Sequence, residues 1–159
     1  VLDILMHDID YLRYLFRQEV SSVYMEAGNF LNKGRTSSDQ AFVTMRFEDG
    51  KIAESSASWI GCEGHPFTQE LDVYGSEASL RYSNSRQPPI TVYAEDGITK
   101  ATPPETDPYR EEIRHFVRCI IEKKKPSISP EDSKASLEVG LAALSSVSLR
   151  RSVDLPYAK

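Results

Sequence analysis

The apolar segment LDILMHDIDYLRYL carries polar residues at spacings that could do chemistry, above all Asp3, His7 and Asp10. The large apolar residues of positions 2–16 form one stripe at about 100° per residue, which predicts a helix over this range. Asp3, His7, Asp10 and Tyr14 then fall within an arc of about 60°, away from the densest part of the stripe. Asp3 and His7 are four residues apart, so their side chains are neighbours on successive turns. A carboxylate can fix the tautomer of an imidazole, and such an imidazole can accept a proton from a hydroxyl.

Two other interpretations of these residues stay open on spacing alone. Asp3 can lie in the first turn because it complements the helix dipole, and His7 can be a solvated surface residue. A metal site would use Asp3, His7 and Asp10, together with His65, as ligands of a divalent ion. One helix does not readily bring three such side chains to a single ion, which disfavours the metal site.

The bulk composition limits the class of protein. The 159 residues have room for one ordinary domain, and no apolar run approaches the ~20 residues that span a bilayer, so no membrane partner is expected. The net charge of −5 and the pI near 5.3 argue against a nucleic-acid partner, which would require a basic face. Two cysteines provide no disulfide framework, so a cytoplasmic location is expected.

The middle of the chain has the pattern of β-strands. Residues 20–28 are rich in β-forming side chains, and residues 41–47 alternate between two faces. An Asp-Gly turn then leads to a returning strand that ends at Trp59. Two further segments meet near Gly75, and a third pair flanks the Asp-Gly of ITVYAEDGITKA. We therefore expect about six or seven largely antiparallel strands between residues 20 and 102.

Two helices are predicted after the Pro-rich segment TPPETDP. Asp107 and Ser129 are the expected N-caps, and a proline follows each of them in the first helical position. Gly140, inside the second of these helices, costs about 1 kcal/mol of helix propensity, which indicates close packing against it. The order helix, strands, helices predicts an α+β fold, with a largely antiparallel open sheet and helices packed on one face.

Motifs along nearly the whole chain resemble the C-terminal domain of the Gfo/Idh/MocA family of NAD(P)-dependent sugar oxidoreductases. DILMHDID resembles the D-x-x-x-H motif that opens this domain, and FEDGKIAE resembles its F-x-x-G hairpin. VYGSEASL resembles its G-S/T-x-G/A-x-L/I/A strand, and YREEIRHFVRCI its Y-x-x-E-I/L-x-x-F helix. SPEDSKASLEVGLAALSS and VDLP resemble its last helix and exit strand. The resemblance implies a dihydrodipicolinate-reductase-like C-terminal domain.

The resemblance also implies roles for the first helix. His7 matches the catalytic base that acts on a sugar hydroxyl, and Asp3 matches the residue that orients it, while NAD or NADP takes the hydride. The third catalytic residue of the family, a Lys in an E-K-P motif, belongs to the nucleotide-binding domain, and this chain has neither E-K-P nor G-x-G-x-x-G. We therefore expect residues 1–159 to be a single substrate-binding and oligomerisation domain, inactive alone. A Rossmann domain that binds most of the cofactor is expected before Val1.

Other polar or aromatic residues are candidate substrate contacts: Asp10, Trp59, His65 and Tyr109, with Asn29 and Arg35 as weaker ones. Trp59 can stack on a sugar ring, although a lone Trp is more often in a core or interface. His65 lies in the loop GCEGHPF, for which the resemblance implies a substrate contact. HDIDYLRYL and the strand ending in Trp59 are most similar to nucleotide-sugar 3-dehydrogenases of the family, so the expected substrate is a sugar or nucleotide sugar.

Two alternatives to the dehydrogenase remain. One is a non-enzymatic, stand-alone assembly or ligand-binding module in which D-x-x-x-H is a relic, and the other is a metal-dependent hydrolase. For assembly, residues 51–59 carry small Ala and Ser side chains on both faces, which permits close approach of another sheet. The resemblance implies a homodimer formed through the open sheet face.

Overall fold

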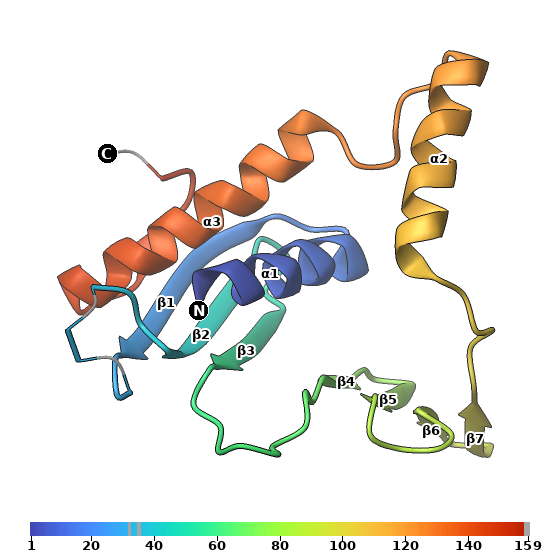
Figure 1. The fold of residues 1–159 in the computed structure, drawn as a ribbon, viewed down its shortest axis with the longest axis horizontal. Helices are drawn as coiled ribbons and strands as arrows, with labels where there is room; N and C mark the ends of the chain where they lie inside the picture. The colour runs from blue at the N-terminus through green and yellow to red at the C-terminus, as the bar shows by residue number, and fades with distance from the viewer. Residues whose placement is uncertain (32, 35, 158–159) are drawn as a thin grey trace. The chain divides into compact units, whose positions relative to one another are not determined.

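The computed structural model describes residues 1–31, 33–34 and 36–157, which contain three helices and eight strands (Figure 1). The chain divides into two compact units, the first formed by Val1–Cys62 and Lys125–Lys159 and the second by Glu63–Lys124. All recorded strand pairs are antiparallel, so the predicted α+β class with largely antiparallel strands is confirmed. The described strands form two hydrogen-bonded sheets of four, one in each unit, because no pairing joins β3 to β4.

The first unit begins with the predicted helix, α1 (Leu2–Phe16). Leu5, Ile9 and Leu12 on its apolar stripe are buried, which confirms the period of the pattern. The helix ends at Arg17, which has a left-handed conformation with φ 50° and ψ 42°. This C-cap reverses the chain into β1 (Val20–Gly28).

The sheet of the first unit has the strand order β3-β2-β1-β8. It contains β1, β2 (Gln40–Phe47), β3 (Ile52–Ser58) and the short exit strand β8 (Val153–Asp154). Side chains of β2 are buried and exposed in strict alternation, as the sequence pattern predicts. At the Asp-Gly turn between β2 and β3, Gly50 has φ 88°, a conformation that favours glycine.

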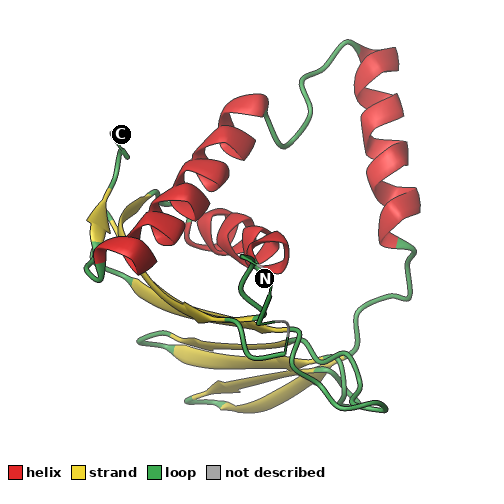
Figure 2. Ribbon diagram, turned by 60° about the vertical axis from the view of Figure 1, so that its left-hand side comes forward, coloured by secondary structure: helices red, strands yellow, loops and turns green. Residues whose placement is uncertain are grey.

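Helices α1 and α3 (Pro130–Leu149) cover the same face of this sheet (Figure 2). Buried apolar side chains from both helices and from the four strands form one core. Where α1 and α3 pack together, a Cβ on Gly140 would lie 2.6 Å from the Met6 Sδ atom. The close packing that the sequence predicts at Gly140 is therefore present, with α1 as the partner.

We expect Gly140→Val to destabilise the protein by about 1–3 kcal/mol, because the added Cβ and its two methyl groups meet the partly buried Met6 side chain. The measurement is the free energy of unfolding by urea. Combining the change with Met6→Ala should recover part of the loss, and Ser148→Val at an exposed position of α3 is the control for β-branching. An unchanged stability in Gly140→Val would show that the helices are free to separate.

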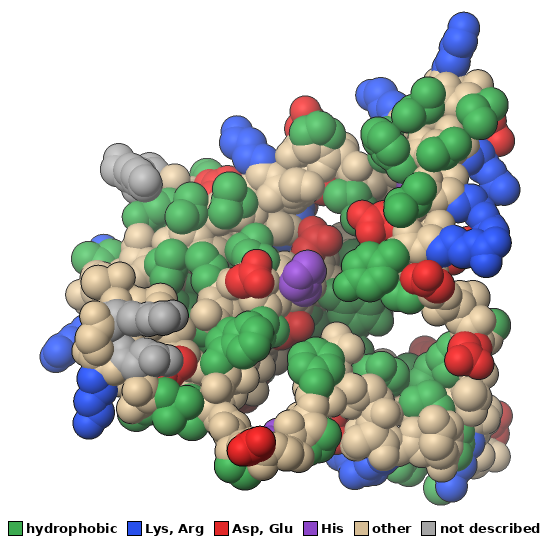
Figure 3. Space-filling view, viewed as in Figure 1, with side chains coloured by type: hydrophobic (Ala, Val, Ile, Leu, Met, Phe, Trp, Pro, Cys, Tyr) green, Lys and Arg blue, Asp and Glu red, His purple; other side chains and the backbone are tan. Residues whose placement is uncertain are grey.

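The second unit contains its own sheet, with strand order β4-β5-β6-β7. Its strands are β4 (Glu70–Tyr74), β5 (Ala78–Ser83), β6 (Ile90–Ala94) and β7 (Gly97–Ala101). The unit ends with α2 (Pro108–Glu122), which the Asp107 side chain caps as predicted. Large apolar side chains of α2 are 46% to 75% exposed, and Figure 3 shows them gathered along this helix: Ile113, Phe116, Val117, Ile120 and Ile121.

No helix in the described part of the chain has both the length and the apolar character needed to cross a bilayer.

Candidate functional site

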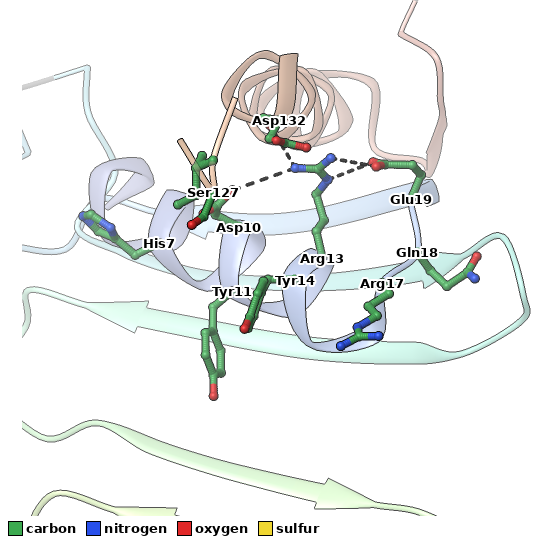
Figure 4. Close-up of a pocket in the computed structure, with 11 residues that line it drawn as sticks. His7, Asp10, Tyr11, Arg13, Tyr14, Arg17, Gln18, Glu19, Ser127 and Asp132 are labelled. Carbon is green, nitrogen blue, oxygen red and sulfur yellow. Dashed lines mark hydrogen bonds and ion pairs between the residues drawn. The ribbon is translucent and has the colours of Figure 1, made fainter. Parts of the chain in front are cut away.

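A pocket of about 600 Å³ lies in the first unit, between α1 and the segment that begins α3 (Figure 4). Its α1 wall includes His7, Asp10 and Arg13, and the facing wall includes Ser127 and Asp132. The pocket is thus formed by segments more than a hundred residues apart in the sequence, and it contains two of the residues that the sequence predicts for the site.

His7 and Asp10 reach the pocket because they are three residues apart on one helix. The His7 side chain is exposed, whereas that of Asp10 is partly buried. Asp3 is exposed one turn before His7 and does not line the pocket. Among the described residues, the structure records no hydrogen bond between Asp3 and His7, so their catalytic pairing stays a prediction.

Asp10 is held by a residue of α3. The hydroxyl of Ser136 donates to Asp10 Oδ1 at 2.7 Å, and Arg13 Nη1 lies 3.8 Å from the same oxygen. Ser136 is 2% exposed, so the donor end of this hydrogen bond is shielded from water. The carboxylate of Asp10 consequently has a defined orientation at the pocket.

Arg13 is buried, with 7% of its surface exposed, and each of its charged nitrogens has a partner. Nε and Nη2 donate to the two carboxylate oxygens of Glu19 at 2.8 and 2.7 Å. Nη1 donates to the Asp132 carbonyl at 2.9 Å and to Ser136 Oγ at 2.7 Å. The hydrogen bonds to Glu19 are the main reason that the pKa of Arg13 is raised above its ordinary value.

The sequence interpretation did not identify Arg13 or Ser136 as site residues, although a signal was present. Arg13 lies four residues after buried Ile9, where the apolar stripe of α1 would otherwise continue. Ser136 occupies the buried stripe of α3 together with Val139 and Gly140. A charged or polar residue at such a position requires partners, and the partners mark a structured polar network.

Asp132 anchors the start of α3 at the pocket wall. Its carboxylate accepts hydrogen bonds from the Ser129 backbone N–H at 2.8 Å and the Ser129 hydroxyl at 2.7 Å, while Ser129 Oγ accepts from the Asp132 N–H at 3.1 Å. The predicted N-cap is therefore part of a capping box. The hydrogen bonds from Ser129, with a smaller contribution from the charge of Arg13, lower the pKa of Asp132.

A carboxyl group whose pKa is lowered by folding stabilises the native state above its unfolded pKa of about 3.9. That stabilisation is lost as the pH falls through the lower, folded-state value. We therefore expect Asp132→Asn to destabilise the protein at pH 6 and to have a smaller effect at pH 2.5, measured by urea unfolding. Glu131→Gln, at the adjacent helix position outside the capping box, is the matched control. An equal effect of Asp132→Asn at both pH values would contradict the assignment.

Trp59 follows β3 directly and is 61% exposed, so it is not a core residue of this structure. Its backbone N–H donates to the Asp39 carbonyl at 2.8 Å, which fixes the end of the strand. Asp39 in turn accepts from the backbone N–H groups of Phe30 and Leu31, at 2.9 and 2.8 Å. These bonds hold the backbone of Phe30 and Leu31, next to Asn29. Arg35 lies outside the described residues.

His65 and Tyr109 belong to the second unit. His65 is exposed, and its Nδ1 lies 2.9 Å from the Pro66 carbonyl oxygen. Tyr109 is 76% exposed in the first turn of α2, where its N–H donates to Asp107 Oδ1 at 3.0 Å. Both side chains are accessible to a ligand, and their contact with substrate stays a prediction.

The described residues contain no group of three His, Cys, Asp or Glu side chains placed to hold a metal ion. They also do not fit the phosphates of a dinucleotide. Each of the three helices has an acidic side chain in its first turn: Asp3 in α1, Glu111 in α2, and both Glu131 and Asp132 in α3. These charges repel phosphate, which the N-terminus of a helix would otherwise attract.

The sequence comparison identifies the family of the chain. Residues 1–155 match the Gfo/Idh/MocA family model described as "Oxidoreductase family, C-terminal alpha/beta domain". The chain belongs to this family, which confirms the resemblance drawn from its motifs.

Named relatives of this chain include two inositol dehydrogenases. Myo-inositol 2-dehydrogenase from Thermotoga maritima is 28% identical over 97% of this chain and 48% of that protein. Scyllo-inositol 2-dehydrogenase (NAD(+)) from Bacillus subtilis is 30% identical over 91% of this chain and 44% of that protein. The chain spans about half the length of the curated relatives it matches.

Solved structures share the fold. A levoglucosan dehydrogenase in complex with NADH and levoglucosan superposes with a TM-score of 0.80, covering 98% of this chain and 50% of that chain. The sequence identity is 22%, so this likeness concerns the fold alone.

Proposed function

We propose that residues 1–155 are the substrate-binding and catalytic domain of an NAD(P)-dependent oxidoreductase that acts on the CH–OH group of a cyclic polyol or sugar. The observation that carries the proposal is the joint position of His7 and Asp10 at one pocket, on the helix that bears the D-x-x-x-H motif. The two inositol dehydrogenases among the relatives support a cyclic polyol as substrate. No relative named above supports the expected nucleotide sugar.

His7 is the general base in this proposal. It accepts the proton of the reacting hydroxyl, and Asp3, one turn earlier on α1, orients the imidazole. Asp10 accepts a hydrogen bond from a second hydroxyl of the polyol, which fixes the ring in the pocket. A nicotinamide cofactor, when bound, accepts the hydride from the carbinol carbon. Because the described residues do not fit the phosphates of this cofactor, we assign its binding to a preceding Rossmann domain in the complete enzyme, which we expect to be cytoplasmic. The relative named for NAD(+) favours NAD over NADP.

In the complete enzyme, assayed with myo-inositol and NAD, His7→Ala should lower kcat by about 10²–10⁴ with a smaller effect on KM, because loss of a general base acts mainly in the transition state. Asp3→Asn should cost less. His115→Ala, on α2, is the matched control. If the kcat of His7→Ala matched that of the parent enzyme across pH 6 to 9, the catalytic assignment would be wrong.

Residues 1–159 alone should show no NAD(H) binding by calorimetry, and micromolar affinity would overturn the assignment of the cofactor to another domain.

We also propose that the protein forms a two-fold homodimer through the face of the first sheet that no helix covers. Phe42 and Ile52 lie on this face and are 51% and 65% exposed. Phe42 is paired with Ser56 of β3, and the small side chains of Ser56 and Ser58 permit close approach of a second sheet there, while Ile52 is paired with Arg46. A stable interface of this kind buries on the order of 1,200–2,000 Å².

Phe42→Glu is expected to convert the dimer to a monomer, because it removes an exposed aromatic side chain from the proposed interface and adds a second carboxylate beside Glu26, its neighbour on β1. Light scattering at tens of micromolar protein measures the molar mass. Ser148→Glu, at an exposed position of α3, is the control for the added charge and should stay dimeric. A folded, monomeric parent protein at this concentration would refute the dimer.

A further inference from the structure

The hydrogen bond that the Asp10 carboxylate accepts comes from a residue distant in the sequence. Ser136 donates to Asp10 Oδ1 across a separation of 126 residues, from a position on α3 that is 2% exposed. Among the described residues, no exposed side chain of α1 donates a comparable hydrogen bond to the Asp10 carboxylate. The orientation of this pocket carboxylate is therefore set by the packing of α3 against α1.

Arg13 determines which way the Ser136 hydroxyl points. A guanidinium has five N–H donors and no acceptor, so Ser136 Oγ must accept the 2.7 Å hydrogen bond from Arg13 Nη1. A serine hydroxyl has a single proton, and the remaining partner of Oγ is Asp10 Oδ1. That proton is consequently directed to the Asp10 carboxylate, which makes Asp10 the acceptor at the end of a one-way chain of hydrogen bonds.

The start of this chain is itself immobilised. Glu19 binds the guanidinium of Arg13 through two parallel hydrogen bonds, and the Asp132 carbonyl holds Nη1 from the other side (Figure 4). Bidentate pairing fixes the plane of the guanidinium as well as its position. The Glu19 side chain is 55% exposed, but the Asp132 carbonyl holds Nη1 independently of it, so the geometry at Ser136 does not rest on one solvated side chain alone.

The other oxygen of Asp10 is left for a ligand. The side chain of Asp10 is 37% exposed and lines the pocket, and the structure records no partner for Oδ2 among the described residues. A carboxylate with one oxygen already hydrogen-bonded to the protein and the other without a recorded partner is an acceptor for a hydroxyl group.

We propose that Ser136 and Arg13 are positioning residues, which fix the Asp10 carboxylate so that Oδ2 accepts a hydrogen bond from a polyol hydroxyl. The inference rests on the proposed function, because it assigns substrate contact to Asp10. It adds that substrate affinity depends on two residues that themselves do not touch the substrate. Both residues act through the ground-state contact of Asp10, so they affect KM more than kcat.

The test is a double-mutant cycle in the complete enzyme with myo-inositol and NAD. Ser136→Ala should raise KM for myo-inositol about tenfold, the effect of a lost hydrogen bond to a charged group, with kcat within about twofold. In an Asp10→Ala background, the same change should alter KM by less than about twofold, because its target is absent. Ser133→Ala, an exposed serine on the same helix, is the matched control and should leave KM unchanged.

A second pair of variants separates the hydroxyl from packing. Ser136→Thr keeps the hydroxyl, and Ser136→Val has the shape of Thr with a methyl group in place of that hydroxyl, so both variants add similar bulk. KM should be about tenfold lower in Thr than in Val, the same effect of a hydrogen bond to a charged group, and circular dichroism verifies that both variants are folded at the assay temperature.

The possible outcomes separate this inference from the proposed function. If Asp10→Ala raises KM and Ser136→Ala does not, the positioning role is wrong while the proposed function stands. If the effects of Ser136→Ala and Asp10→Ala are fully additive, or if Thr and Val behave alike, Ser136 has only a packing role and the inference is overturned. If Asp10→Ala itself leaves KM unchanged, the substrate contact in the proposed function is wrong, and the inference falls with it.

Discussion

The burial of the Arg13 guanidinium is the constraint on which the architecture of the pocket depends. An uncompensated charge in a protein interior costs several kcal/mol, so every donor of a buried arginine needs a partner. Here the partners come from three places, namely Glu19 after α1, the Asp132 carbonyl at the start of α3, and Ser136 one turn further. Satisfying one side chain therefore joins the end of α1 to the first turns of α3. The walls of the pocket are those same segments.

In this arrangement the acidic group Asp10 and the basic group His7 at the pocket differ in burial and in hydrogen bonding. Asp10 is partly buried and held by a hydrogen bond from a buried donor, which suits a residue that orients a ligand. His7 is exposed, and the described residues provide no hydrogen-bond partner that fixes its ring. A general base needs a defined orientation at the moment of proton transfer.

The second unit shows what helix periodicity predicts and what it does not. The 3.6-residue pattern of α2 and its Asp107 N-cap were both predicted from the sequence, and both are present. The same pattern implies an apolar face that needs a partner, yet the apolar side chains of α2 are largely exposed in the structure. An amphipathic pattern specifies that a helix forms and which side is apolar. It contains no information about which surface the apolar side covers.

The sequence by itself determined the local structure and the family. Period 3.6 located α1 with its buried stripe, alternation located β2, and the Ser-Pro and Asp-Pro pairs located the starts of α3 and α2. Gly140 even indicated a close contact, although the sequence did not name Met6 as the partner. Only the tertiary structure decided that the strands form two sheets, and that Ser136 and Arg13 orient Asp10. The reason is physical: periodicity and capping depend on neighbours within about four residues along the chain. A hydrogen bond between residues 126 positions apart exists only after two helices have packed on the same sheet.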